Sequence, residues 1–190
     1  MKREKPVDDS KDKCYYRVVQ SQFGDINVVW KVSQSDIKII QLVLPRTRCD
    51  IKRCLRVITE SCPSFIDRIC RGIEQFVGGK AVDFPLRHFD TSQLYSFQKR
   101  VLLFERRIPY GWVSTYRRLA KKMGTPGAAR AIGNALSRNP FPLVIPCHRT
   151  IRSDGSLGGF SGGLQLKRQL LELEGIRFDK GGKVIMENLW

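Results

Sequence analysis

Three apolar runs with strand character follow one another near the start of the chain, at residues 15–19, 26–32 and 37–44. β-Branched and aromatic residues dominate each run, and Gly24-Asp25 separates the first two. Connections this short join antiparallel strands, because a parallel pair needs a crossover of a dozen or more residues. The runs therefore predict an antiparallel meander.

The spacing of apolar residues becomes helical after the meander. Residues 64–77 predict a helix with Ser64 as its N-cap and Gly78-Gly79 as its end. Together with the strands, this helix makes a small α/β unit. Residues 81–92 are predicted to connect two domains, so we expect one domain over residues 1–88 and a second over residues 89–190.

The second half of the chain has helical periodicity. Helices are predicted over residues 93–106, 115–123 and 164–174, and another opens at Pro126 and runs to residue 138. Two of these are short and are joined by Met123-Gly124-Thr125-Pro126, which predicts a helix-turn-helix.

Cys147 is followed directly by His148 and Arg149, neighbours that favour the thiolate, which is the nucleophilic form of cysteine. The preceding residues 142–145 predict a short buried extended segment, and the glycine-rich residues 158–163 would let backbone approach a ligand. Adjacent strand residues point to opposite faces, so a buried structural thiol stays open as an alternative.

The charge balance predicts a polyanionic partner. The chain has 34 basic and 18 acidic residues, a net charge of +16, and residues 89–190 hold 17 basic and 7 acidic residues, or +10 of it. No apolar run approaches the roughly 20 residues that span a bilayer. Nucleic acid is therefore favoured over a membrane.

Six cysteines are scattered without Cys-x-x-Cys spacing, and no apolar segment follows the charged start of the chain. These features predict free thiols in a reducing compartment, the cytoplasm, or the nucleus if the source is eukaryotic. A zinc site from Cys49, Cys54 and His88 is an alternative, but the spacing matches no closed four-ligand pattern. We expect neither metal nor cofactor.

In its second half the chain resembles the O6-alkylguanine-DNA alkyltransferases, also called methylated-DNA–protein-cysteine methyltransferases. The resemblance covers residues 97–175. Its motifs are Phe97-Gln98 with Val101, Ile108–Gly111, Tyr116 with Leu119-Ala120, Ala129–Ala135, Asn139-Pro140, Ile145–Arg149, Ser161–Gly163 and Leu170–Gly175. It implies an α+β protein, with a ribonuclease-H-like first domain and a helical second domain whose helix-turn-helix is of the winged-helix type.

The resemblance also implies DNA repair by direct damage reversal. Cys147 would take the alkyl group irreversibly from O6-alkylguanine, and from O4-alkylthymine, in a single turnover. His148 would act as base through a water and Glu174 would orient it, the logic of hydrolytic triads. Asn139 would steady the turn before the cysteine, and Tyr116 would donate a hydrogen bond to the departing base.

The partner implied by the resemblance is double-stranded DNA, bound by a monomer through the minor groove. The damaged nucleotide would be flipped out, and Arg130 would fill the space that it leaves. The expected DNA-binding residues are Arg130, Ala129, Gly133, Asn134, Arg138, Tyr116 and Thr115. The expected substrate-pocket residues are Tyr116, Pro142, Phe160, Ser161, Gly162 and Lys167.

Two other functions compete with alkyl transfer. A damage-binding module like the alkyltransferase-like proteins would flip the base without accepting the alkyl group, but such proteins lack the cysteine that this chain has at position 147. A helix-turn-helix transcription factor would fit the charge and Arg130. It would leave Ile145–Arg149 and the glycine-rich loop without a role.

Overall fold

The first half of the chain forms a sheet, as the apolar runs predict. The computed structural model describes residues 13–33, 36–47, 56–57 and 62–190. Its larger sheet has the order β3-β2-β1-β4, with β1, β2 and β3 antiparallel and β4 parallel to β1. The strands are β1 (Lys13–Val19), β2 (Ile26–Val32), β3 (Ile37–Val43) and β4 (Arg56–Val57). The predicted meander is confirmed, and β4 adds a short strand that periodicity did not predict.

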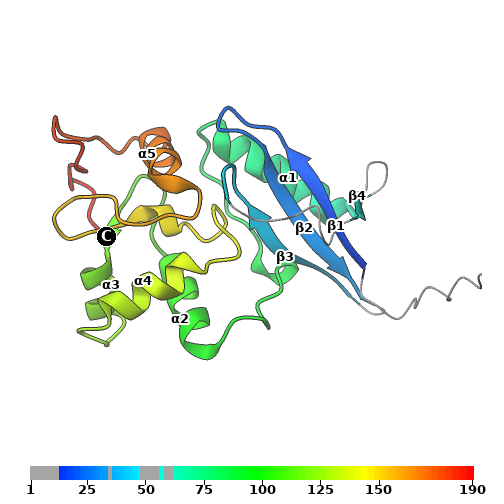
Figure 1. The fold of residues 1–190 in the computed structure, drawn as a ribbon, viewed down its shortest axis with the longest axis horizontal. Coiled ribbons are helices and arrows are strands. Elements are labelled where there is room, and N and C mark those ends of the chain that lie inside the picture. Colours follow the sequence, from blue (N-terminus) through cyan, green and yellow to red (C-terminus); the bar gives the residue numbers. More distant parts are fainter. Residues whose placement is uncertain (1–12, 34–35, 48–55, 58–61) are drawn as a thin grey trace, which may run out of the picture.

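Helix α1 (Ser64–Val77) lies against this sheet (Figure 1). Its buried face includes Ile66, Ile73 and Phe76, which share one apolar core with Trp30 of β2. The helix spans the predicted residues, but Ser64 is not its N-cap. Pro63 occupies that position, and no side chain caps the helix.

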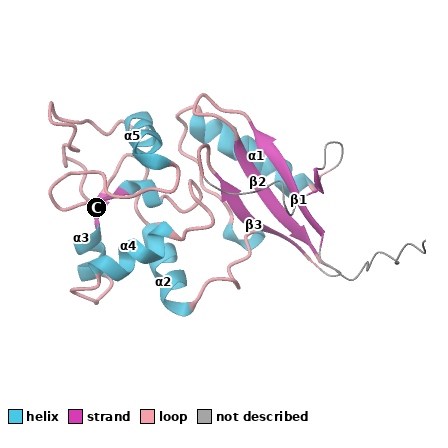
Figure 2. Cartoon of the chain, in the orientation of Figure 1, coloured by secondary structure: helices cyan, strands magenta, loops and turns pink. Residues whose placement is uncertain are grey.

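The first half ends with the short helix η2 (Leu86–His88), and the regular structure of the second half is mainly helix (Figure 2). The elements of the second half are α2 (Ser96–Glu105), β5 (Ser114–Thr115), α3 (Tyr116–Lys122), α4 (Ala129–Ser137), η3 (Cys147–Arg149), β6 (Thr150–Ile151) and α5 (Gly163–Leu173). Strands β5 and β6 pair in parallel. Helices α3 and α4 pack together, as expected for a helix-turn-helix.

Two local predictions in this half are wrong. Helix α4 begins at Ala129 and not at Pro126, because Gly127 has a φ of 93°, outside the helical region. Residues 142–145 are not extended. Leu143 has a φ of 71°, and the amide of Ile145 donates to the carbonyl of Phe141 at 2.8 Å, so the segment is a tight turn.

The turn before Cys147 is attached to the edge of the sheet. The amide of Leu42 donates to the carbonyl of Pro140 at 2.8 Å, and the ring centroids of Phe89 and Phe141 lie 5.1 Å apart. One buried apolar cluster runs from the sheet to Cys147. The two halves therefore share a core, and the sheet acts as a platform for the turn.

The last residues of the chain pack against the helical half. The amide of Val113 donates to the carbonyl of Asn188 at 2.9 Å, and the amide of Trp190 donates to the carbonyl of Val113 at 2.8 Å. Val113 and Val184 belong to a second, smaller apolar cluster. In the described part of the chain, no helix has the length and apolar content needed to cross a membrane.

Candidate active site and nucleic-acid interface

Cys147 is held at the start of η3 by the side chain of Asn139. Asn139 Nδ2 donates to the carbonyl of Ile145 at 2.9 Å and lies 3.2 Å from Cys147 Sγ. Its Oδ1 accepts from the amide of Phe141 at 3.0 Å. The asparagine therefore closes the turn on both sides and also contacts the thiol.

The thiol of Cys147 is buried and protonated at rest. Burial raises its pKa to about 11, although the hydrogen bond from Asn139 opposes this shift. The prediction that His148 and Arg149 favour the thiolate is therefore wrong. Arg149 is committed to Glu174, and His148 is uncharged, so neither offers a free positive charge to the sulfur.

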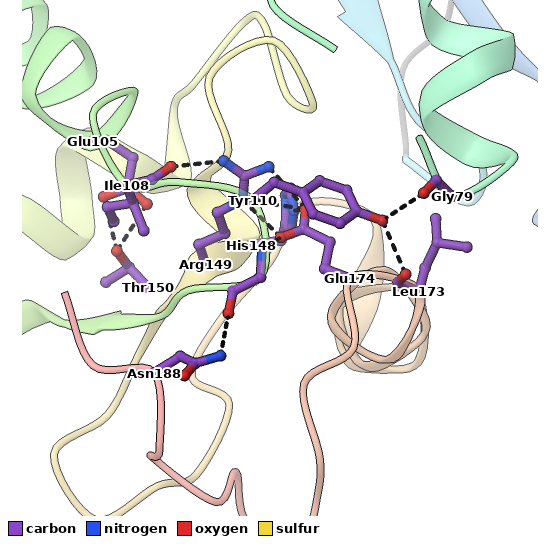
Figure 3. Close-up of polar contacts among 11 residues, drawn as sticks. Gly79, Glu105, Ile108, Tyr110, His148, Arg149, Thr150, Leu173, Glu174 and Asn188 are labelled. Carbon is purple, nitrogen blue, oxygen red and sulfur yellow. Dashed lines mark hydrogen bonds and ion pairs between the residues drawn. The ribbon is translucent and has the colours of Figure 1, made fainter. Parts of the chain in front are cut away.

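Glu174 contacts both residues that follow Cys147, namely His148 and Arg149 (Figure 3). Its Oε1 lies 2.8 Å from His148 Nε2, and its Oε2 accepts from Arg149 Nε at 2.8 Å. The amide of Gly111 also donates to Oε2, at 3.1 Å. Burial alone would raise the pKa of Glu174, but His148 and Arg149 lower it to about 2. The carboxylate is therefore ionised.

His148 is a neutral imidazole. Burial lowers its pKa, and the rings of Phe76 and Phe160 meet it edge-on, with centroids 6.0 and 6.3 Å away. Because the ionised Glu174 can only accept, Nε2 carries the proton. The basic atom is then Nδ1, which is buried and has no hydrogen-bond partner among the described residues.

A cavity of about 520 Å³ lies over Cys147. It is lined by Tyr116, Ala129, Arg130, Gly133, Leu136, Ser137, Cys147, Arg152, Gly158, Gly159, Phe160 and Ser161. The lining therefore combines residues of α4 with residues of the glycine-rich loop. Cys147 of the Ile145–Arg149 motif therefore lines the same cavity as helix α4, which carries the Ala129–Ala135 motif.

Tyr116 lies in the cavity wall as a protonated phenol. Burial raises its pKa to about 12, with a further contribution from Cys147. Its hydroxyl packs against Gly158, where an added Cβ would lie 2.9 Å from the Tyr116 oxygen and where φ is 69°. Only glycine fits there, because a side chain would both strain the backbone and collide with the ring.

Several predicted site residues lie outside the cavity lining. Thr115 caps α3, its Oγ1 accepting from the amide of Arg118 at 3.1 Å, and Arg138 donates to the Tyr95 hydroxyl at 3.1 Å. Lys167 is buried beneath the glycine-rich loop. Also absent from the lining are Pro142, Gly162, Asn134, Asn139, His148 and Glu174.

Three cavity residues belong neither to the predicted site residues nor to the glycine-rich loop 158–163. They are Leu136, Ser137 and Arg152. The first two follow Gly133 at helical spacing on α4, so continuing the helix face would have found Leu136 and Ser137. Arg152 had no such signal, because the path of the loop after β6 decides where it lies.

No group of three or more His, Cys, Asp or Glu side chains is placed to hold a metal among residues 13–33, 36–47, 56–57 and 62–190. Of the zinc alternative, Cys49 and Cys54 lie outside the described residues. His88 stacks on Phe65, with ring centroids 4.4 Å apart.

Comparison with known proteins places this geometry in one family. The family described as "6-O-methylguanine DNA methyltransferase, DNA binding domain" matches residues 96–176. A methylated-DNA–protein-cysteine methyltransferase of Methanothermobacter thermautotrophicus is 46% identical over 119 residues, 63% of this chain and 66% of that protein. One of Metallosphaera sedula is 38% identical over 163 residues, 84% of this chain and 92% of that protein.

A solved structure has the same fold. The Mycobacterium tuberculosis OGT in complex with DNA superposes with a TM-score of 0.70 at 29% sequence identity. The superposition covers 84% of this chain and 92% of that one. The likeness therefore extends to the sheet and is not limited to the helical half.

Proposed function

The chain belongs to the methylated-DNA–protein-cysteine methyltransferase family, and from this premise we propose that it repairs DNA by taking the methyl group of O6-methylguanine onto Cys147. The observation that carries the proposal is the cavity in which Cys147, Tyr116 and the exposed Arg130 share one space. Alkyl transfer from DNA requires a nucleophile, a hydrogen-bond donor to the departing base and a positively charged side chain beside the DNA. O4-alkylthymine belongs to the proposed substrate range.

The transfer is a displacement at carbon. Cys147 Sγ forms a bond to the methyl carbon while the bond from that carbon to guanine O6 breaks. The thiol proton passes through a water to His148, whose Nδ1 is the basic ring nitrogen, and Glu174 stabilises the charge that His148 gains. This base is needed because the resting thiol has a pKa of about 11.

The departing guanine takes the electron pair of the broken bond. Tyr116, with its pKa raised to about 12, keeps its proton and donates a hydrogen bond to a ring nitrogen of the base. Phe160 and Ser161 from the glycine-rich loop face the base across the cavity. The product is a thioether, which is stable because a thiolate is a poor leaving group, so each molecule acts once.

The target atom lies inside the duplex, so the nucleotide must be flipped into the cavity. Helix α4 is the element we assign to the DNA, through its minor groove. Arg130 is exposed at the cavity rim, with no hydrogen bond or ion pair among the described residues, and so is available to enter the duplex. Ala129 and Gly133 are small and permit close approach.

The finer architecture is part of the same proposal. We assign residues 1–88 to a ribonuclease-H-like domain, supported by the order β3-β2-β1-β4 with a parallel β1–β4 pair. Residues 89–190 form the DNA-binding and acceptor domain, with the α3–α4 pair as a helix-turn-helix of the winged-helix type. We expect the protein to act as a monomer.

The deciding experiment is intact-protein mass spectrometry after incubation with a duplex that carries O6-methylguanine. We expect a gain of one methyl group, located on Cys147 by peptide mapping and absent in Cys147→Ser. Cys62→Ser, which removes a half-buried thiol elsewhere, is the matched control and should still gain the methyl group. Tight binding without any mass gain would instead favour a damage-binding module.

A further inference from the structure

Glu105, the last residue of α2, is a fully buried carboxyl group that the proposed mechanism does not use. Its two oxygens lie 2.8 and 2.7 Å from one atom, the hydroxyl oxygen of Thr150 in β6 (Figure 3). In the described part of the chain, Glu105 forms no ion pair. A buried carboxylate without a cationic partner is costly, so burial favours the neutral form of Glu105.

The contact with Thr150 also favours a neutral Glu105. The Thr150 hydroxyl has one proton, so it can donate to only one of the two Glu105 oxygens. The other oxygen is equally close, and it makes a full hydrogen bond of its own if it carries a proton and donates it to Thr150. The geometry therefore fits a neutral carboxylic acid. Burial raises the pKa of Glu105 to about 8, which agrees with this protonation state at neutral pH.

The groups around Glu105 belong to the transfer site. The charges of Lys167 from α5 and Arg149 from η3 act on its carboxyl group, and the Glu105 charge in turn raises the pKa of Cys147 and Tyr116. Lys167 is itself buried, and burial lowers its pKa to about 8. The charge state of Glu105 therefore affects the pKa of both the nucleophile, Cys147, and the hydrogen-bond donor, Tyr116.

Thr150 also joins Glu105 to the glycine-rich loop. Its hydroxyl contacts Glu105, and its carbonyl accepts from Lys167 Nζ at 2.6 Å. The same Nζ lies 3.4 Å from the carbonyl of Gly159, which lines the cavity. The contacts run from α2 through β6 and α5 to the cavity wall.

We propose that Glu105 is a positioning residue for methyl transfer, which holds Thr150 and Lys167 in place as a neutral acid and slows the transfer when it ionises. This inference rests on the proposed function. An ionised Glu105 would place a negative charge near Cys147 and oppose thiolate formation. Transfer should therefore fall above about pH 8, although a thiol alone would react faster as pH rises.

The test measures the first-order rate of methyl transfer at saturating O6-methylguanine duplex from pH 6.5 to 9.5. Saturation separates transfer from DNA binding. Wild type should fall about tenfold between pH 8 and pH 9.5, as expected for titration near pH 8. Glu105→Gln cannot ionise but keeps a hydrogen bond to Thr150, so it should stay within about threefold of wild type at pH 7 and lose most of the alkaline fall.

Two further variants complete the design. Glu105→Leu with Thr150→Val removes both polar partners, folds without an unpaired buried group, and should also lack most of the alkaline fall. Glu172→Gln, on the exposed face of α5, is the matched control and should keep the wild-type profile. A wild-type alkaline fall in Glu105→Gln, or no fall in wild type, overturns the inference. No methyl gain at any pH overturns the proposed function instead.

Discussion

Asn139 Nδ2 lies 3.2 Å from Cys147 Sγ and 2.9 Å from the carbonyl oxygen of Ile145, so one amide group holds both the nucleophile and the turn that presents it. The contact to sulfur lowers the pKa of Cys147 against the larger effect of burial. Positioning and activation of the thiol are therefore linked through a single side chain.

Asn139→Ala should lower both stability and transfer rate. The variant leaves the amide of Phe141 without its buried acceptor and removes one of the two donors to the carbonyl of Ile145, which keeps the amide of Cys147. This loss costs about 2 kcal/mol in the free energy of unfolding. Urea denaturation measures this loss, and single-turnover methylation measures the rate. Asn134→Ala, at an exposed position on α4, should change stability by less than about 0.5 kcal/mol. Equal losses in the two variants would contradict the assigned role.

Glu174→Gln should remove part of the acid sensitivity of the fold. The pKa of Glu174 is about 2 in the folded chain, below its ordinary value of 4.5, so its contribution is complete above about pH 4.5 and is lost as pH falls towards 2. The variant should lack this slope and be about 3–5 kcal/mol less stable at pH 7, because Arg149 loses its buried partner.

Denaturation of Glu174→Gln at several pH values between 2.5 and 7 measures both effects. Glu172→Gln changes an exposed carboxylate two residues away and should keep the wild-type slope. An unchanged slope in Glu174→Gln would show that its carboxylate is not the group responsible.

Arg130→Ala should slow repair in duplex DNA far more than reaction with the free base O6-benzylguanine. The side chain is exposed at the cavity rim, and its proposed role is to occupy the duplex after flipping. Loss of that role should cost at least about tenfold on duplex substrate, or about 1.4 kcal/mol. Arg177→Ala removes the same charge at a distant exposed site paired with Glu187. Equal loss on both substrates would exclude a role inside the duplex.

DNA affinity should depend strongly on salt, because the net charge of +16 implies phosphate contacts. If about six phosphates are neutralised, affinity for undamaged duplex should fall about 10³-fold between 50 and 200 mM salt. Fluorescence anisotropy of a labelled duplex across this range gives the slope. A slope near zero would contradict electrostatic binding.

Deletion of residues 188–190 should destabilise the helical half. The deletion removes the backbone bonds that Val113 makes to Asn188 and Trp190, and the bond from Asn188 Nδ2 to the carbonyl of Gly111. We expect a loss of about 2–4 kcal/mol and slower transfer, because Val113 precedes β5 and Tyr116. Met186→Ala, at an exposed tail position, is the control and should be near neutral.

Local sequence patterns were sufficient for much of the fold. Strands β2 and β3 and helix α1 follow from spacing alone, because apolar periodicity depends on near neighbours in the chain. The order of motifs, with Cys147 and Arg130 among them, was sufficient to recognise the family. The predicted limits of helix α4 and of the segment before Cys147 were wrong because Gly127 and Leu143 have positive φ angles.

Only the tertiary structure decided the chemical state of the site. Neighbours in sequence suggested that Arg149 serves Cys147, yet its guanidinium turns to Glu174, 25 residues away. Burial then keeps the thiol protonated. Glu105 and Thr150 are 45 residues apart and meet only because α2 and β6 pack together. Charge, burial and pairing depend on which distant segments surround a group, so the sequence named the nucleophile and the packing determined how it must be activated.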